Sequence, residues 1–290
     1  MKVYILLILL IGFNSFAQTI CSDANLPTLT DAGLNAFSEN EFTKSFQGSS
    51  ITVIGEIHFY TDLKPRLDFI QQWKQKALGK KCVAYEWAKK EYDFVEFMNR
   101  IKKNIDAIKG PAYAAGNPQL KVEDIQKLAA AFEQIYNYYW PMAELTQNLN
   151  MKAVMVDSAD HNFTSSKSMD ERNLAMAENL NILLKSGECD SILFFVGKAH
   201  LAKNTDSSTR VQDLARSLGI SVNTINLQMT NETVPYAVRS WSICPISQSL
   251  KLADYAFLKN DQLVGDYTLF PYMMNDLTRW KDFDYTLLVP

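Results

Sequence analysis

The chain has 290 residues, of which 47% are hydrophobic and 21% charged, and its formal net charge is −3. This composition is that of a globular protein with a sizeable core, which excludes an intrinsically disordered chain. A slightly acidic chain has no basic field to hold a phosphate backbone, so nucleic acid is excluded as a partner.

The N-terminus has the pattern of a secretory signal. Lys2 is followed by a short apolar run, and the small residues Ser15 and Ala17 occupy the −3 and −1 positions of a cleavage site. We therefore predict a signal peptide over residues 1–17 and a mature chain that is exported to the periplasm or secreted. The residues before Cys21 lack the small residue that lipid attachment requires, which argues against a lipid anchor there. No later segment is predicted to span a membrane.

Apolar, β-branched runs alternate with helical patterns along the rest of the chain. Unbroken apolar runs indicate strands that are covered on both faces, as in a parallel sheet. Their alternation with helices predicts an α/β fold, a mostly parallel sheet flanked by helices. Residues 240–281 show no regular pattern. We expect strands at 51–54, 82–85, 153–156, 192–196, 222–227 and 285–289, and helices at 63–73, 169–185 and 211–218.

A helical insertion is expected at about residues 88–150, between two of these strands. It contains helical patterns at 92–108 and 122–149, separated by two turns rich in glycine and proline. Because this excursion is longer than a minimal crossover, we expect a single α/β domain over residues 18–290 that carries an insertion.

Aromatic residues cluster in the insertion. At helical spacing such a cluster is more often core, and the alternative is a pocket for an apolar substrate. Its members are Tyr92, Phe94, Tyr113, Tyr136, Tyr138, Tyr139 and Trp140.

Two of the three histidines end near-identical phrases. Gly55 to His58 and Gly197 to His200 both read Gly-x-x-His, and each phrase follows an apolar strand. The carboxyl ends of parallel strands lie along one edge of the sheet, where α/β proteins place their ligand sites. Glycine permits a tight exit from the strand and a positive φ where one is needed. We therefore predict two pseudo-repeats, each ending a strand in Gly-x-x-His, with both imidazoles at one edge.

Acidic residues are expected at the same edge. Glu56 lies two residues before His58, and Glu86 and Asp157 each follow an apolar strand. Carboxylates beside imidazoles can orient a histidine that deprotonates water. They can also complete a divalent metal site, for which His58, His200, Glu56 and Glu86 are the tentative ligands. For Glu86 or Asp157 alone, a helix N-cap or a solvated strand end is an equal alternative.

Arg172 is predicted to have a specific partner. It lies in the first turn of an amphipathic helix, where the helix dipole disfavours a cation. That partner is either a carboxylate of the sheet edge or an anionic substrate oxygen, and the alternative is an exposed pair with Asp170 or Glu171. His161 is expected to be a loop histidine rather than a ligand, because no Gly-x-x-His surrounds it.

The four cysteines remain after the predicted cleavage, and an exported compartment permits disulfides. Four cysteines allow three pairings, among which the sequence does not choose. Two of them flank apolar strands and are equally well explained as small buried residues. The four are Cys21, Cys82, Cys189 and Cys244.

Four motifs in order resemble the superfamily that unites erythromycin esterases, ChaN-like haem-binding lipoproteins and the TraB/Tiki proteins. They lie at residues 55–58, 83–86, 172–179 and 197–200, and the resemblance spans about residues 50–227. It implies a two-repeat α/β fold with one cleft. By similarity, the residues that line it are Glu56, His58, Glu86, Arg172 and His200.

The resemblance also implies three kinds of chemistry. Esterase-like members use a histidine to activate water, Tiki-like members are metal-dependent peptidases, and ChaN-like members bind haem. The chain has no Gly-x-Ser-x-Gly or similar nucleophile motif, so water is the expected nucleophile.

From these observations we expect a hydrolase, an esterase or a metal-dependent peptidase, that acts on a small-molecule or peptide substrate. His58 is the expected general base, Glu56 and Glu86 orient it or bind a metal, and His200 is a second base or ligand. Arg172 is expected to hold developing negative charge. The alternative is a haem- or iron-binding protein, in which these histidines or Tyr60 are axial ligands.

Overall fold

A computed structural model of the chain describes ten segments: residues 43, 46–56, 58, 63–90, 93–117, 119–158, 168–201, 209–229, 256–259 and 282–289. The predicted signal peptide, Cys21, Tyr60, His161 and Cys244 lie outside these residues. The chain divides into two compact units, Phe46–Asn223 and a second unit that contains Thr224–Pro290 together with Met1–Ser45.

The first unit is built on four parallel strands in the order β3-β2-β4-β1. Strands that follow one another in the chain are connected through helices, as parallel pairing requires. The strands are nearly all buried, which explains their unbroken apolar runs. Their bounds are β1 Ile51–Glu56, β2 Lys81–Ala88, β3 Lys152–Asp157 and β4 Ser191–Gly197.

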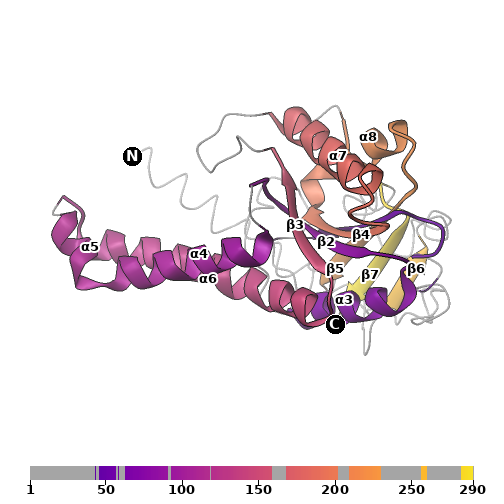
Figure 1. The fold of residues 1–290 in the computed structure, drawn as a ribbon. Coiled ribbons are helices and arrows are strands. Elements are labelled where there is room, and N and C mark those ends of the chain that lie inside the picture. Colours follow the sequence, from indigo (N-terminus) through magenta and orange to yellow (C-terminus); the bar gives the residue numbers. More distant parts are fainter. Residues whose placement is uncertain are drawn as a thin grey trace, which may run out of the picture. The chain divides into compact units, whose positions relative to one another are not determined.

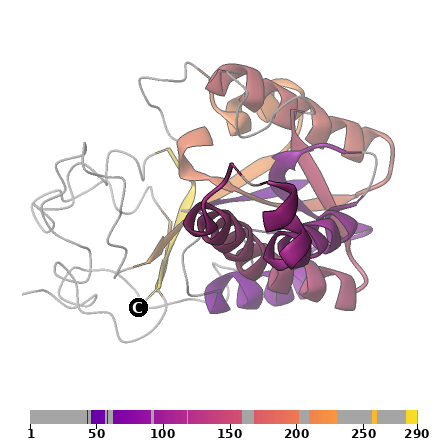
Figure 2. The same cartoon turned by 90° about the vertical axis from the view of Figure 1, so that its left-hand side faces the viewer.

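Helices cover both faces of these strands. Helices α7 (Met169–Lys185) and α8 (Val211–Ser217) lie on one face and α3 (Lys64–Lys76) on the other (Figures 1 and 2). Helix α7 begins where the sequence predicts, because Ser168 and Glu171 form a capping box around its first turn. The predicted fold class, a mostly parallel sheet flanked by helices, is confirmed.

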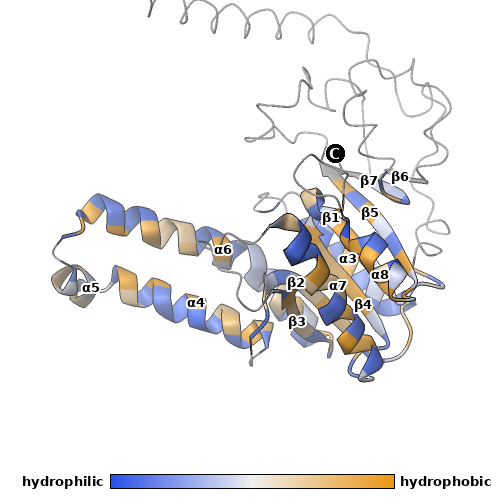
Figure 3. Cartoon of the chain, turned by 90° about the horizontal axis from the view of Figure 1, so that it is seen from above, coloured by the Kyte–Doolittle hydropathy of each residue, from blue (hydrophilic) through white to orange (hydrophobic). Residues whose placement is uncertain are grey.

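The insertion between β2 and β3 is a long helical hairpin (Figures 1 and 3). Helices α4 (Phe94–Lys109) and α6 (Val122–Asn148) run side by side. Apolar and polar residues alternate along both helices at helical spacing. A short helix, α5 (Pro111–Gly116), joins them where the sequence indicated only turns. Asp93 caps α4 through the backbone N–H of Glu96.

The second unit contains most of β5 (Val222–Met229), together with β6 (Ala256–Lys259) and β7 (Tyr285–Val289). Strand β7 pairs parallel with β5 and antiparallel with β6. The interpretation of residues 240–281 as irregular is wrong at β6. Four residues are too few for an apolar alternation to stand out in the sequence.

Cys82 and Cys189 form a disulfide that joins the start of β2 to the residues before β4. It spans 107 positions of sequence within the first unit. This pair is one of those that the sequence left open. Among the residues that the structure describes, no helix is long and apolar enough to cross a membrane.

Candidate functional site

The strand order brings four predicted site residues to one edge of the first unit. Strand β4 lies between β1 and β2, and Glu56 of β1 pairs in register with Gly197 of β4. Glu86 lies near the end of β2, and His200 follows β4 in a short 3-10 helix. His58 follows β1 by two residues. The doubled phrases are thus on adjacent strands, although most of the unit separates them in sequence.

Glu86 is the centre of the site and receives four hydrogen bonds. One carboxylate oxygen accepts from Arg172 at 2.5 Å and from His200 Nε2 at 2.8 Å. The other oxygen lies 3.0 Å from His58 Nε2 and accepts from the backbone N–H of Gly197 at 2.7 Å. Both predicted histidines and the predicted arginine therefore share one carboxylate.

Gly197 is explained by this close approach rather than by its backbone angles. Its φ is −59°, which any residue adopts. A Cβ at this position would lie 3.0 Å from His58 Nε2 and 3.3 Å from the Glu86 carboxylate. Glycine therefore allows a closer approach of His58 and Glu86 to this strand end than a residue with a side chain would.

Glu56 is buried and has three partners. Arg66 Nε donates to one carboxylate oxygen at 2.5 Å, and the Tyr138 hydroxyl donates to the other at 2.6 Å. His58 Nδ1 lies 3.3 Å from the second oxygen. Arg66 and Glu56 are both fully shielded from solvent at their side chains, so each neutralises the other.

Arg172 joins Glu86 to Asp157, the acidic residue after β3. Its Nε and terminal nitrogen donate to one Asp157 oxygen at 3.0 and 2.6 Å. The other Asp157 oxygen accepts from the backbone N–H of Ser158 at 2.7 Å. The specific partners that the sequence predicted for Arg172 are therefore carboxylates of the sheet edge.

His200 is held on both sides of its ring. Its Nδ1 lies 2.5 Å from the side-chain oxygen of Asn173, whose amide nitrogen donates to the Thr209 carbonyl. Its Nε2 faces Glu86. Both ring nitrogens of His200 therefore have a side-chain oxygen as partner. His200 is buried, whereas the His58 side chain is 26% exposed and is the more accessible imidazole.

The charges of the site shift the pKa values of three groups. Burial alone would lower the pKa of His58, but the carboxylates of Glu86 and Glu56 raise it to about 10. Burial would raise the pKa of Glu86, but the imidazoles of His200 and His58 hold it well below its usual range. The pKa of Glu56 is also lowered, because the Arg66 guanidinium outweighs the effect of burial. His58 is therefore charged at neutral pH.

Four contributors to the site were not predicted as site residues. Arg66 lies at helical spacing with Phe69, Ile70 and Trp73, on the buried face of α3. A charged residue on the apolar face of a helix indicates a buried partner of opposite charge. The position of Arg66 in the sequence could therefore have predicted its ion pair. Asn173 lies within the motif at residues 172–179, and Tyr138 and Tyr139 lie within the aromatic cluster. Their contacts with the site depend on how α7 and α6 pack, which the sequence does not show.

The tentative metal ligands lie close together, but their nitrogen and oxygen atoms contact each other instead of pointing at a common centre. Each ring nitrogen of His58 and His200 faces a side-chain oxygen, and Arg172 already occupies an oxygen of Glu86. Within the described segments, no group of three or more His, Cys, Asp or Glu side chains is arranged to hold a metal ion. In this arrangement the set does not fit a divalent cation, which would compete with a guanidinium for the same oxygen.

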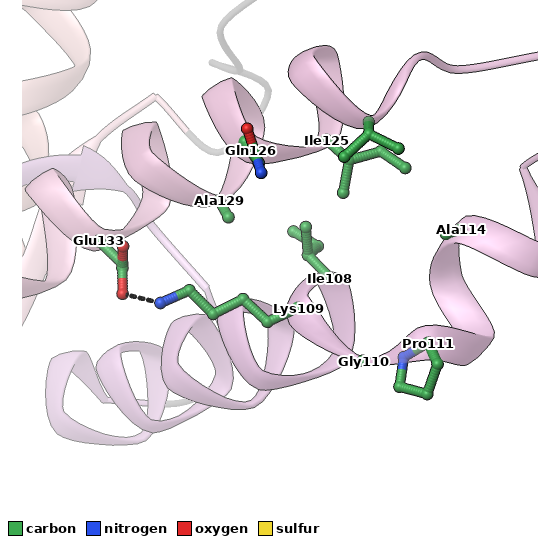
Figure 4. Close-up of a pocket in the computed structure, with 10 residues that line it drawn as sticks. Ile108, Lys109, Gly110, Pro111, Ala114, Ile125, Gln126, Ala129 and Glu133 are labelled. Atoms are coloured by element: carbon green, nitrogen blue, oxygen red, sulfur yellow. Dashed lines mark hydrogen bonds and ion pairs between the residues drawn. The ribbon is translucent and has the colours of Figure 1, made fainter.

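A separate pocket lies at the far end of the hairpin, between α4, α5 and α6 (Figure 4). It has a volume of about 380 Å³ and is lined mainly by apolar side chains, including Ile108, Ile125 and Ala129. An ion pair of Lys109 with Glu133 lies at its side. None of the predicted site residues lines this pocket.

No protein-family model and no curated protein sequence matches the chain. Among solved structures, the type III effector HopBA1 is similar with a TM-score of 0.41 and 11% sequence identity, over 66% of this chain and 82% of that chain. ChaN of Campylobacter jejuni, which binds heme cofacially, is similar with a TM-score of 0.36 and 12% identity, over 91% of this chain and 96% of that chain. At these values neither similarity bears on the function of this chain.

Proposed function

We propose that the chain is a hydrolase of ester or amide bonds, in which His58 transfers the proton and Glu86 holds it in place. The observation that carries the proposal is the shared Glu86 carboxylate, which fixes His58, His200 and Arg172 around one point of the sheet edge. A partly exposed imidazole held by a buried carboxylate is a common arrangement for acid–base catalysis. The substrate class is a small molecule or a peptide.

The protonation state of His58 favours the role of general acid over that of general base. The sequence made it the general base, but a pKa of about 10 keeps the ring charged at neutral pH. We therefore propose that His58 is the acid. Water attacks the carbonyl carbon and releases its proton to solvent. The Nδ1–H of His58, whose contacts with Glu56 and Tyr139 are both as long as 3.3 Å, turns from them to give its proton to the leaving oxygen or nitrogen, and the ring regains a proton from solvent. The sum consumes one water and yields an acid and an alcohol or amine.

The other residues support this step without touching the substrate. Arg172 and the imidazole of His200 contact Glu86, and Arg66 pairs with Glu56. These contacts favour the ionised form of both carboxylates, whose pKa values are lowered. The His58 imidazolium is the group that faces developing negative charge on the substrate. No step in this proposal passes through a metal.

Two further features support a setting outside the cytoplasm. The predicted signal peptide is one, and the Cys82–Cys189 disulfide is the other, because disulfides persist in oxidising compartments. We propose that the mature chain acts in the periplasm or is secreted.

A panel of aryl esters and anilides tests the activity. We expect His58→Gln to lower kcat/KM by at least about 100-fold. The matched control is Glu96→Gln on the exposed face of α4, which should leave the rate unchanged. The pH profile tests the role: the rate should fall as the pH rises past 10 for an acid, whereas a base would give a rate that rises up to that pH. A folded His58→Gln protein with the wild-type rate would refute the proposal.

Hemin addition tests the alternative of haem or iron binding. In the structure, an axial histidine would first have to leave the oxygen that its ring nitrogen faces. We expect no Soret shift at micromolar protein. If a Soret band forms, is lost in His58→Gln, and no ester or anilide is cleaved, the hydrolase proposal is overturned in favour of the haem alternative.

A further inference from the structure

Two adjacent tyrosines of the hairpin reach the site. Tyr138 and Tyr139 lie in the C-terminal half of α6, and both side chains are almost completely buried. Their rings meet edge to face with centroids 4.7 Å apart. Although they are neighbours in sequence, their hydroxyls contact two different members of the site, Glu56 and His58.

Tyr138 fixes the Glu56 carboxylate together with Arg66. The Tyr138 hydroxyl donates to one oxygen at 2.6 Å, Arg66 donates to the other, and the Arg66 guanidinium carbon lies 5.2 Å above the Tyr138 ring. The carboxylate is therefore held at both oxygens and cannot rotate freely. A phenylalanine would fill nearly the same space, so packing alone does not account for the hydroxyl.

Tyr139 contacts His58 directly. Its hydroxyl lies 3.3 Å from His58 Nδ1, on the side of the ring opposite the Glu86 contact. A hydroxyl can donate to a bare nitrogen or accept from an N–H, so it holds the ring in either form. The Tyr139 ring is itself fixed by edge-to-face contacts with Tyr85, Phe94 and Trp87.

We infer that Tyr138 and Tyr139 are positioning residues, by which the helical hairpin holds Glu56 and His58 in the orientation that the site requires. The inference rests on the proposed function only in the consequence for the rate, because the orientation of His58 can be measured without a substrate. On this view the insertion completes the site and is not an appendage of the sheet. The opposing interpretation is that both tyrosines are core residues whose hydroxyls have no effect on the site.

Single hydroxyl deletions separate the two interpretations. We compare Tyr138→Phe and Tyr139→Phe with Tyr136→Phe, a matched control on the same helix. The Tyr136 ring stacks on Trp140, and among the described residues its side chain contacts none of the site. For Tyr139→Phe we expect kcat on a cleaved aryl ester to fall about tenfold with KM unchanged within twofold, because the hydroxyl acts on His58 and not on the substrate. Tyr136→Phe should change neither constant.

The ring signals of His58 provide the second measurement. In proton–nitrogen NMR spectra of the full chain, both site variants should change the chemical shifts of the His58 ring nitrogens. Both should also speed the exchange of the ring N–H protons with solvent, and Tyr136→Phe should do neither. Unchanged His58 signals in both variants would overturn the inference, even if the wild type hydrolyses esters. Shifted signals in a protein that cleaves nothing would uphold the positioning role and refute the proposed hydrolase.

Discussion

His58 lies between two carboxylates, and its contribution to stability depends on pH. Its pKa rises from an ordinary value of 6.5 to about 10 in the folded chain. A group with a raised folded pKa contributes stability that is fully present below the unfolded pKa and is lost as the pH rises through the folded pKa.

The wild type should therefore lose stability relative to His58→Gln between pH 6.5 and 10. We expect a loss of at least about 1 kcal/mol, since one pKa unit corresponds to about 1.4 kcal/mol and His58 is partly screened by solvent. Urea unfolding of both proteins at pH 6, 8 and 10 measures it. A stability difference that stays constant across these pH values would contradict the raised pKa.

Arg172 neutralises two carboxylates that are shielded from water. Its removal leaves Glu86 and Asp157 without this partner, and breaking a buried ion pair typically costs about 3 to 5 kcal/mol. We expect Arg172→Met to lower the free energy of unfolding by about 3 kcal/mol. Arg100→Met is the matched control, because Arg100 forms an exposed pair with Glu96 whose loss should cost about 0.5 kcal/mol or less. Equal effects of the two substitutions would show that the Arg172 contacts are weak.

At the scale of elements, the α4–α6 hairpin has a base that carries Tyr138 and Tyr139 and a distant end with its own small core. That core consists of Ile108, Ile125 and Ala129, with Tyr113 and Phe132 packed against it. Since the two clusters share no residue, the distant end should be dispensable for the site.

A shortened hairpin tests this separation. Replacing residues 107–131 with a six-residue Gly/Ser loop should leave the His58 ring signals and any hydrolytic rate unchanged. The melting temperature should change by less than about 5 °C, which corresponds to about 1 to 2 kcal/mol in a protein of this size. Loss of the His58 signals in a folded, shortened chain would show that the whole hairpin is needed to place the tyrosines.

The sequence predicted most elements because their signals are local. Buried parallel strands appear as unbroken apolar runs, and α7 appears as an amphipathic helical pattern. Strand β6 and helix α5 were missed, because four and six residues are too short for a periodic pattern. In the site, strand ends located Glu86 and both histidines, since parallel strands end at one edge. The contacts of Tyr138 and Tyr139 depend on the angle at which α6 packs, which no local pattern encodes.

At the scale of the whole molecule, the Cys82–Cys189 disulfide is the covalent link across the first unit. It closes a loop of 107 positions that includes the hairpin, β3 and α7. Closing a loop of about this length restricts the unfolded chain and is worth roughly 4 to 5 kcal/mol in the chain-entropy model.

A variant with both Cys82→Ala and Cys189→Ala should lose about 3 to 5 kcal/mol of unfolding free energy. Dithiothreitol should destabilise the wild type by a similar amount and should affect the double variant much less. Denaturant unfolding with and without the reductant measures both effects. A double variant as stable as the wild type would show that the native contacts of β2 and β4 hold the unit without the bond.

The adjacent strands β1 and β4 end in the same phrase, yet their histidines differ in surroundings. The His58 side chain is 26% exposed, whereas that of His200 is 3% exposed between Glu86 and Asn173. We therefore expect the surroundings of the buried His200 to tolerate fewer substitutions than those of the partly exposed His58. Among homologous chains, His200 and Asn173 should be inherited or lost as a pair, while the neighbours of His58 drift as the ligand changes.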